Sequence, residues 1–269
     1  MSPPLLLTLV FLLAFIRPSK SNPTDIFILA GQSNMAGRGG VCNNVWDGVI
    51  PPQCRPNPSI RRFSASLAWE EAHEPLHADI DVYGVCGVGP GMSFANAVRS
   101  ARMRGPSIGL VPCAVGSSGI DDWSKGGRLY GGLIGRARAA VAAAAGGGRI
   151  RAVLWYQGER DAVSAGAAWA YRPKMERFIR DLRLDLGLPS LLFIQVAIAT
   201  GQGPYKNIVR AGQKSIRMPN VVTVDALGLR VAEDYVHLTT QAQVQLGWML
   251  ASAYLSHSRP AQKIVSLSP

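Results

Sequence analysis

Charged side chains are scarce in this sequence, at 17% of 269 residues, whereas hydrophobic residues make up 48%. A chain with so little charge and so many apolar side chains is not intrinsically disordered. Its length is sufficient for a full hydrophobic core without support from metals or disulfides. Because α/β domains of more than about 200 residues are common, we expect a single domain.

Acidic residues are the scarcer charged class, with 17 Asp and Glu against 28 Lys and Arg, so the formal net charge is 28 − 17 = +11. The basic residues form no continuous run and do not alternate with aromatic residues, so nothing predicts a nucleic-acid partner. We interpret them as solvated helix faces. Steering of the protein toward an anionic polysaccharide is a second hypothesis.

Only four cysteines are present, and none are paired in a Cys-x-x-Cys motif, so a structural zinc site is not predicted. They are Cys42, Cys54, Cys86 and Cys113. Four cysteines allow three disulfide connectivities. Because Cys42 and Cys54 bracket a proline-rich loop, a bridge between them is the best single expectation. Four buried thiols are the alternative.

The sequence has one long apolar run, at residues 5–16, which is too short for the roughly 20 residues that span a bilayer. Its length is typical of the core of a signal peptide, although no Lys or Arg precedes it. We expect residues 1–22 to be a cleaved secretory signal and residues 23–269 to form the mature domain. The alternative is a buried N-terminal helix. After cleavage, no stable membrane insertion is expected.

Short apolar runs alternate with longer helical patterns along the rest of the chain. We expect strands at residues 25–30, 80–85, 107–113, 150–156, 191–197 and 221–226, and helices at 92–103, 130–145, 167–186, 205–218 and 239–255. This alternation predicts an α/β fold with a parallel sheet covered on both faces. Residues 37–76 break the rhythm and are expected to form a long insertion.

Two segments at expected strand ends could together perform acyl transfer. Ser33 lies in a glycine-flanked turn after the first strand, where its hydroxyl and nearby N–H groups could supply a nucleophile and oxyanion donors. His237 follows the last strand and precedes the final helix, and Asp234 lies three residues before it. That carboxylate could orient the imidazole toward a serine. Asp225 and Glu233 are rival acids.

The other histidines are weaker candidates for a base. His257 lies near the C-terminal end and suits a surface position. His73 and His77 match the zinc-protease pattern H-E-x-x-H, which requires both on one helix face. Pro75 between them would break such a helix, so we do not predict zinc there.

Six sequence blocks in order resemble the SGNH hydrolase superfamily, and specifically the plant carbohydrate esterases of family six with their sialate O-acetylesterase-like domain. They are GQSNM at residues 31–35, WDG and WEEAHEPL at 46–48 and 69–76, GVGPG at 87–91, WYQGE at 155–159, and DYVHLTT at 234–240. The resemblance covers nearly everything after the expected signal.

The resemblance implies a flavodoxin-like three-layer αβα sandwich around a five-stranded parallel sheet. It also implies Ser33 as nucleophile, His237 as general base and acid, and Asp234 as its partner. The oxyanion donors would be the N–H of Ser33, the N–H of Gly89 (with Gly91 as competitor) and the Gln157 amide. No cofactor or metal is implied. The expected activity is removal of O-acetyl groups from carbohydrate, such as acetylated xylan of the cell wall, by a secreted enzyme.

Two positions depart from the related plant sequences. Arg160 stands where those sequences carry serine, and Tyr235 stands where they carry glycine. Both could alter the pocket, which keeps a non-catalytic carbohydrate-binding protein as the alternative function. A nucleotide-binding domain is discounted, because Gly87, Gly89 and Gly91 lack the G-x-G-x-x-G spacing.

Overall fold

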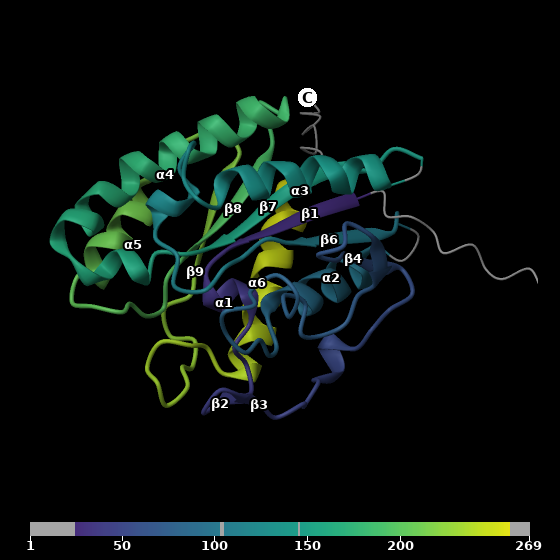
Figure 1. Cartoon of the computed structure of the whole chain (residues 1–269), viewed down its shortest axis with the longest axis horizontal. Helices are drawn as coiled ribbons and strands as arrows, with labels where there is room; N and C mark the ends of the chain where they lie inside the picture. The colour runs from purple at the N-terminus through teal and green to yellow at the C-terminus, as the bar shows by residue number, and fades with distance from the viewer. Residues whose placement is uncertain (1–24, 103–104, 145, 259–269) are drawn as a thin grey trace, which may run out of the picture.

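The protein, described by a computed structural model over residues 25–102, 105–144 and 146–258, has three layers. A twisted sheet forms the middle layer and helices cover both of its faces (Figure 1). This arrangement confirms the predicted α/β fold. The expected signal at residues 1–22 lies outside the described residues.

Within the described residues the main sheet has seven strands in the order β5-β4-β6-β1-β7-β8-β9. All neighbours pair in parallel except β4 and β5, which are antiparallel. A separate hairpin is formed by β2 and β3. The strands are β1 Asp25–Gly31, β2 Val41–Cys42, β3 Val45–Trp46, β4 Ile60–Phe63, β5 Trp69–Glu71, β6 Ile108–Pro112, β7 Arg149–Tyr156, β8 Leu192–Ala197 and β9 Val221–Asp225.

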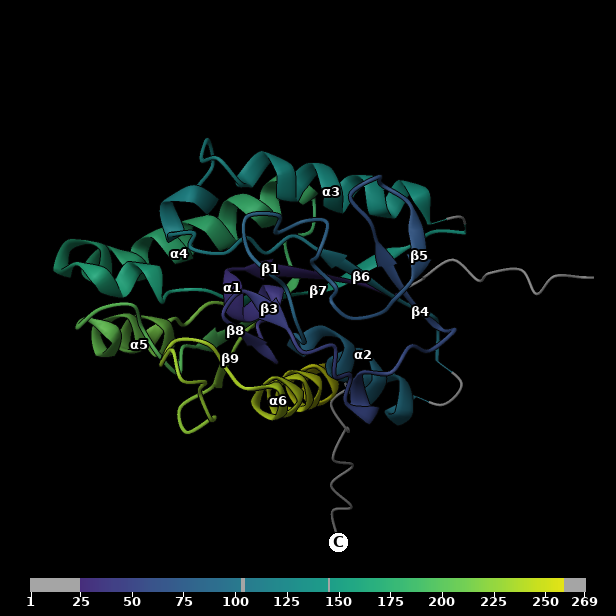
Figure 2. The same ribbon diagram turned by 60° about the horizontal axis from the view of Figure 1, so that its bottom comes forward.

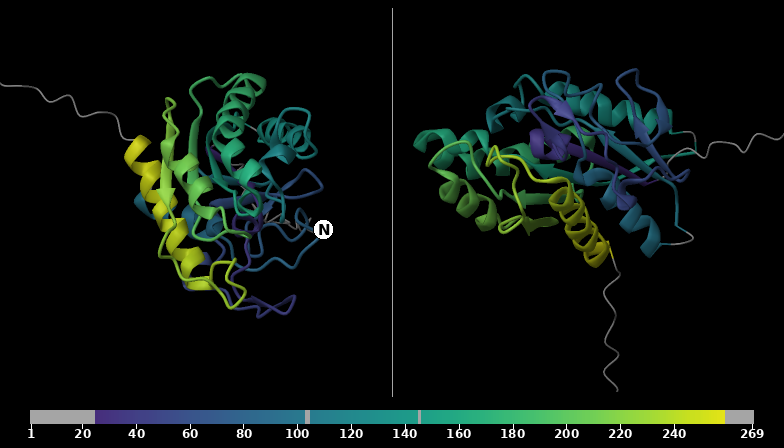
Figure 3. Two further views of the ribbon diagram at one scale, coloured as in Figure 1. Left: turned by 90° about the vertical axis from the view of Figure 1, so that its left-hand side faces the viewer. Right: turned by 90° about the horizontal axis from the view of Figure 1, so that it is seen from below.

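Helices α2 and α6 lie side by side on one face of the sheet, and α3, α4 and α5 lie on the other (Figures 2 and 3). The helices are α1 Ser33–Ala36, α2 Pro90–Ala101, α3 Tyr130–Ala143, α4 Ala165–Leu186, α5 Lys206–Ser215 and α6 Thr240–Ser258. Three short 3-10 helices are η1 Pro52–Cys54, η2 Ile120–Trp123 and η3 Arg160–Val163. Every helix predicted from the sequence is present with slightly shifted ends.

Aromatic side chains fill the core on both faces of the sheet. Phe27 of β1 packs edge-on against Tyr254 of α6, with ring centroids 4.8 Å apart. Trp155 of β7 packs against Phe178 of α4 at 4.8 Å on the other face. Around Phe27 and Trp155, strands β1 and β7 are buried on both faces of the sheet. Their residues there are therefore continuously apolar, and do not alternate between apolar and polar. This packing fixes the positions of β1 and β7, and so the positions of the residues that follow their carboxyl ends.

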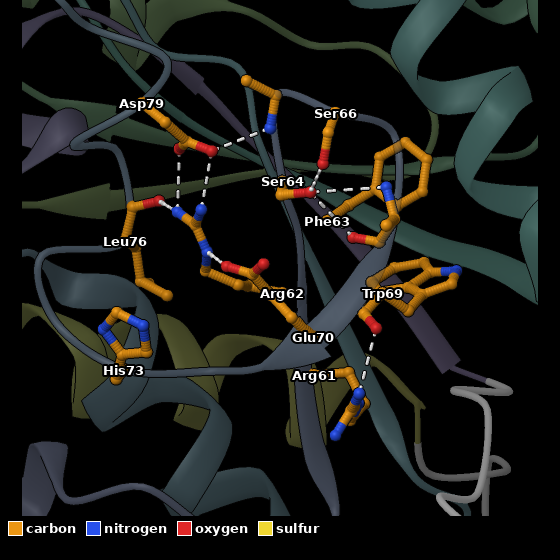
Figure 4. A network of polar contacts seen from close by, with 12 residues as sticks. Arg61, Arg62, Phe63, Ser64, Ser66, Trp69, Glu70, His73, Leu76 and Asp79 are labelled. Carbon is orange, nitrogen blue, oxygen red and sulfur yellow. Dashed lines mark hydrogen bonds and ion pairs between the residues drawn. The ribbon is translucent and has the colours of Figure 1, made fainter.

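The sheet is larger than the expected five strands because β4 and β5 lie inside the segment predicted to be an insertion. The sequence pattern does not indicate β4, because it contains Arg61 and Arg62, and two adjacent arginines are atypical of a buried strand. The Arg62 guanidinium is nonetheless buried and bonded to Glu70 at 2.6 Å, to Asp79 at 2.7 and 2.9 Å, and to the Leu76 carbonyl (Figure 4). These partners compensate for the lost hydration of the charge.

The strand expected at residues 80–85 is absent from the described structure, where these residues form turns. Its apolar side chains are not buried, since Val82 is 65% and Tyr83 88% exposed. Asp81 is the buried residue instead, and it forms an ion pair with Arg38 at 2.5 Å. Packing of a polar side chain therefore overrides the local β-propensity of the segment.

The predicted Cys42–Cys54 bridge is wrong, because all four cysteines are free. Cys42 is exposed in the β2–β3 hairpin, whereas Cys54 is buried in η1. Burial raises the pKa of the Cys54 thiol to about 12. Cys86 and Cys113 are buried, so the alternative of buried thiols holds for three of the four.

Among residues 25–102, 105–144 and 146–258, no helix combines the length and the apolar character that crossing a membrane requires.

Candidate functional site

Ser33 lies at the carboxyl end of β1. Strands β4, β5 and β6 lie on one side of β1 in the sheet, and the later strands β7, β8 and β9 lie on the other, so the strand order reverses at β1. In open α/β sheets, ligands bind beyond such a switch point. Gly31, the last residue of β1, has φ 128°, and a Cβ there would collide with the Tyr156 carbonyl oxygen of β7. Glycine therefore permits the close approach that ends the strand and starts α1 at Ser33.

His237 and Asp234 lie on the loop between β9 and α6, and they reach Ser33 across the sheet edge. The Ser33 Oγ is 2.9 Å from the His237 Nε2, and the His237 Nδ1 is 2.6 Å from the Asp234 Oδ2. The other oxygen of Asp234 accepts the backbone N–H groups of Val236 and His237, each at 2.9 Å. Partial burial opposes ionisation of Asp234, but these hydrogen bonds outweigh it and lower its pKa. The carboxylate is thus held charged beside the imidazole.

The rival acids and histidines lie elsewhere. Asp225 accepts the Leu227 N–H at 2.9 Å and pairs with Lys214 at 2.9 Å and Arg210 at 2.8 Å, and despite partial burial these bonds hold its pKa at about 2. Glu233 is exposed. His73 is exposed and His77 is buried, both on a non-helical segment, so they do not share a helix face. His257 is exposed near the end of α6.

Asn34 holds the backbone on both sides of His237. Its Nδ2 donates to the carbonyl of Val236 at 3.1 Å, and its Oδ1 accepts the N–H of Leu238 at 2.9 Å. Thr200 supports the same loop by donating its hydroxyl to the Val236 carbonyl at 2.7 Å. The residue next to the candidate nucleophile therefore fixes the loop that carries the candidate base. We refer to these contacts of Asn34 as the Asn34 clamp.

The clamp is anchored by Glu159, which follows β7. The Nδ2 of Asn34 donates to the Glu159 Oε1 at 2.7 Å. Glu159 has no exposed surface, and burial raises its pKa to about 7 even though the Asn34 hydrogen bond opposes the shift. Gln243 of α6 completes the arrangement by donating to the Asn34 carbonyl at 3.1 Å. The segment after β7, helix α1 and helix α6 are thus joined at one buried residue, Asn34.

Gly89 precedes the first residue of α2 and lies against α1. A Cβ at Gly89 would lie 3.3 Å from the Gly37 Cα, so the backbone approaches the serine turn closely. Its N–H is 3.3 Å from the Oε1 of Glu74, which also accepts the N–H of Leu76 through its other oxygen at 3.0 Å. Burial raises the pKa of Glu74 to about 8, against these two hydrogen bonds.

Gln157 follows β7 directly and is fully buried. Its Nε2 donates to Asp161 at 2.5 Å and to the Ser118 carbonyl at 3.0 Å, so both amide hydrogens have partners inside the protein. Its Oε1 has no hydrogen-bond partner among the described residues. The roles of Gly89 and Gln157 as oxyanion donors stay predictions.

The two departures from the plant pattern lie at the edge of the site. Tyr235, between Asp234 and Val236, has φ 59°, a left-handed conformation that favours glycine, and the residue is 80% exposed. Arg160 is exposed at the start of η3. Neither side chain interrupts the hydrogen bonds between Ser33, His237 and Asp234.

Sequence reasoning assigned no role to Asn34, Glu159 or Thr200. Asn34 lies in the GQSNM block and Glu159 in the WYQGE block, so the motifs marked both residues without indicating what they do. Their partnership is not visible locally, because 125 residues separate them.

Comparisons with known proteins identify the family of this chain. Residues 23–256 match the family model described as carbohydrate esterase, sialic acid-specific acetylesterase. A probable carbohydrate esterase of Arabidopsis thaliana is 56% identical over 243 residues, covering 87% of this chain and 92% of that protein. A crystal structure of an Arabidopsis thaliana protein superposes with a TM-score of 0.84 at 54% identity, covering 87% of this chain and 98% of that one.

A carbohydrate acetylesterase from Xanthomonas citri shares the fold at 21% identity with a TM-score of 0.62, covering 87% of this chain and 57% of that one. The family match spans most of the sequence and agrees with the resemblance drawn from its motifs. The chain therefore belongs to the carbohydrate esterase family of sialic acid-specific acetylesterases.

Proposed function

We propose that this protein is a serine esterase that removes O-acetyl groups from a carbohydrate through an acyl-enzyme. The observation that carries the proposal is the line of hydrogen bonds from Asp234 through His237 to Ser33, at 2.6 and 2.9 Å. A nucleophile, a base in contact with it and an orienting carboxylate are the parts that acyl transfer requires.

In this mechanism the Ser33 Oγ attacks the acetyl carbonyl while the His237 Nε2 accepts the hydroxyl proton. Asp234 stabilises the resulting imidazolium. His237 then gives the proton to the departing sugar oxygen, and the acetyl group remains on Ser33. Water, deprotonated by His237, attacks the acyl-enzyme and releases acetate. The N–H groups of Ser33 and Gly89 and the Gln157 amide are the proposed donors to the tetrahedral oxyanion. This role requires the Gln157 amide to exchange its Asp161 or Ser118 partner for the oxyanion.

Family membership supports a carbohydrate ester as the substrate class, and acetylated xylan is the specific substrate that we propose. We also propose secretion to the cell wall, on the basis of the apolar run at residues 5–16. The test of secretion is N-terminal sequencing of protein recovered from the medium of expressing cells.

The test of the proposed reaction is hydrolysis of a chromogenic acetate ester and of acetylated xylan by the mature chain. Ser33→Ala is expected to lower kcat by about 10⁶-fold, because a missing nucleophile disables the whole set of groups. Ser66→Ala, in the turn between β4 and β5, is the matched control and should retain activity. Unchanged unfolding curves would show that both variants fold.

A wild-type protein no faster than Ser33→Ala on both esters would refute the esterase proposal. Binding to xylan without turnover would then favour the alternative, a non-catalytic carbohydrate-binding protein. The buried, fully engaged hydrogens of the Gln157 amide are the observation that supports this alternative.

A further inference from the structure

A groove of about 780 Å³ runs between helix α6 and the loop of residues 47–53. The loop follows the β2–β3 hairpin, which lies beside the first turns of α6 (Figure 1). The proposed mechanism uses none of the residues that line this groove. Its size is sufficient for a ligand larger than an acetyl group.

The walls of the groove combine exposed apolar surface with amide side chains. Trp248 is 49% exposed, and Val49 and Ile50 on the opposite wall are 59% and 37% exposed. Gln241 and Gln245 lie seven and three residues before Trp248, so the three side chains share one face of α6. A pyranose ring presents apolar C–H groups on its faces and hydroxyls on its rim. An indole flanked by amides matches that surface, with the ring stacked and the hydroxyls hydrogen-bonded.

The charge of the groove indicates which sugars it could bind. Asp47 is the one charged residue among the described residues that line it, and no Lys or Arg is present there. Without a cation, nothing in the groove compensates for burial of a sugar carboxylate, whereas Asp47 would repel it. The groove therefore suits a neutral sugar and disfavours an acidic one.

The groove begins next to the catalytic residues. Thr240, the first residue of α6, lines it and lies three residues after His237. The backbone at Gly39 packs so closely on Thr240 that a Cβ would lie 2.9 Å from the Thr240 Cα, which joins the groove wall to the segment after α1. Trp248 lies eight residues further along α6, or about 12 Å at 1.5 Å per residue. A chain of sugars bound there would lead away from Ser33.

We propose that this groove binds the neutral backbone of the acetylated polysaccharide whose ester reacts at Ser33, with Trp248 as the main stacking platform. The inference rests on the proposed esterase function, which it deepens by selecting neutral glycans over sialic acids and uronates. It predicts that a polymer gains affinity from contacts remote from the ester, whereas a small ester does not.

The test compares Trp248→Ala with Trp169→Ala. Trp169 is also exposed, at 71%, but lies on α4, outside the groove. Trp248→Ala should raise KM for acetylated xylan about tenfold, as expected for truncation of an aromatic anchor, and leave kcat/KM for a chromogenic acetate unchanged. Trp169→Ala should change neither. Unchanged hydrolysis of acetylated xylan by Trp248→Ala would overturn the proposal.

A second measurement uses binding alone, so that it remains decisive if no ester is hydrolysed. Calorimetry of the Ser33→Ala chain should show binding of soluble deacetylated xylan that weakens about tenfold when Trp248→Ala is added. Polygalacturonate should neither bind as tightly nor compete. Equal xylan binding with and without Trp248, or equal affinity for the acidic polymer, would refute the groove assignment. If the wild-type protein hydrolyses no ester but xylan binding still depends on Trp248, only the esterase function would be refuted.

Discussion

Replacement of Asn34 by alanine should disable the base without touching it. The variant removes the bond to the Val236 carbonyl, the acceptor for the Leu238 N–H and the donor to Glu159. Ser33, His237 and Asp234 all remain. The loop that carries His237 then loses the hydrogen bonds from Asn34 to Val236 and Leu238, the residues on either side of the histidine. A structural role alone would lower stability, whereas a positioning role would also lower kcat.

The magnitude follows from the groups left without partners. Val236 keeps its bond from Thr200, but the Leu238 N–H and the Glu159 Oε1 are stranded in buried surroundings. Each stranded buried group costs about 1–3 kcal/mol, so the free energy of unfolding should fall by about 2–6 kcal/mol. A displacement of the imidazole by about 1 Å should reduce kcat by about 10²-fold.

The assay measures kcat and KM on a chromogenic acetate, together with urea unfolding. Gln195→Ala is the matched control, because Gln195 is a buried amide that donates to the Gln213 carbonyl and to Thr223, at 2.8 and 2.9 Å, far along β8. It should lower stability and leave kcat unchanged. If folded Asn34→Ala retains kcat within about threefold, or if Gln195→Ala loses as much, the clamp does not position His237.

Two further predictions concern stability. Glu159 has a pKa of about 7 in the folded protein, against an ordinary value of 4.5. Between these two pH values the folded protein keeps a proton that the unfolded chain has lost. The free energy of unfolding therefore falls as pH rises through this window. Glutamine at this position does not titrate, so the free energy of unfolding of Glu159→Gln relative to wild type should rise by about 3 kcal/mol between pH 4.5 and 8. Urea unfolding at a series of pH values measures this difference. Parallel plots of unfolding free energy against pH for the two proteins would contradict the prediction. Tyr235→Gly should gain about 1 kcal/mol, because glycine adopts φ 59° without strain, and a lower urea midpoint would contradict that.

Three of the strands that sequence predicted correctly show their burial in their composition. β1, β6 and β8 are mostly apolar and are buried along their whole length, so both pattern and packing favour a strand. β4 is equally buried but contains Arg61 and Arg62, and only the distant Glu70, Leu76 and Asp79 make that burial tolerable. A pattern of residue types cannot show partners that tertiary structure supplies.

The same limit applies to the candidate site. Ser33 stands out in a glycine turn, and Asp234 and His237 are three residues apart, so short spacings reveal all three. Asn34 acts through Glu159 and Val236, which are 125 and 202 residues away in sequence. The oxyanion donors are the least predictable part, because the direction of a single amide such as Gln157 depends on neighbours that no motif contains.

The hydrogen bond between Ser33 and His237 joins residues 204 positions apart, one just after the first strand and the other just before the last helix. A ribosome adding about 5–20 residues per second needs about 10–40 s to pass from the first to the second. Under the proposed mechanism, the nascent chain during that interval carries Ser33 without its base and cannot use it to cleave esters. Under the proposed mechanism, recovery of hydrolysis after refolding therefore reports that the two ends of the chain have met, and not that either end has folded locally.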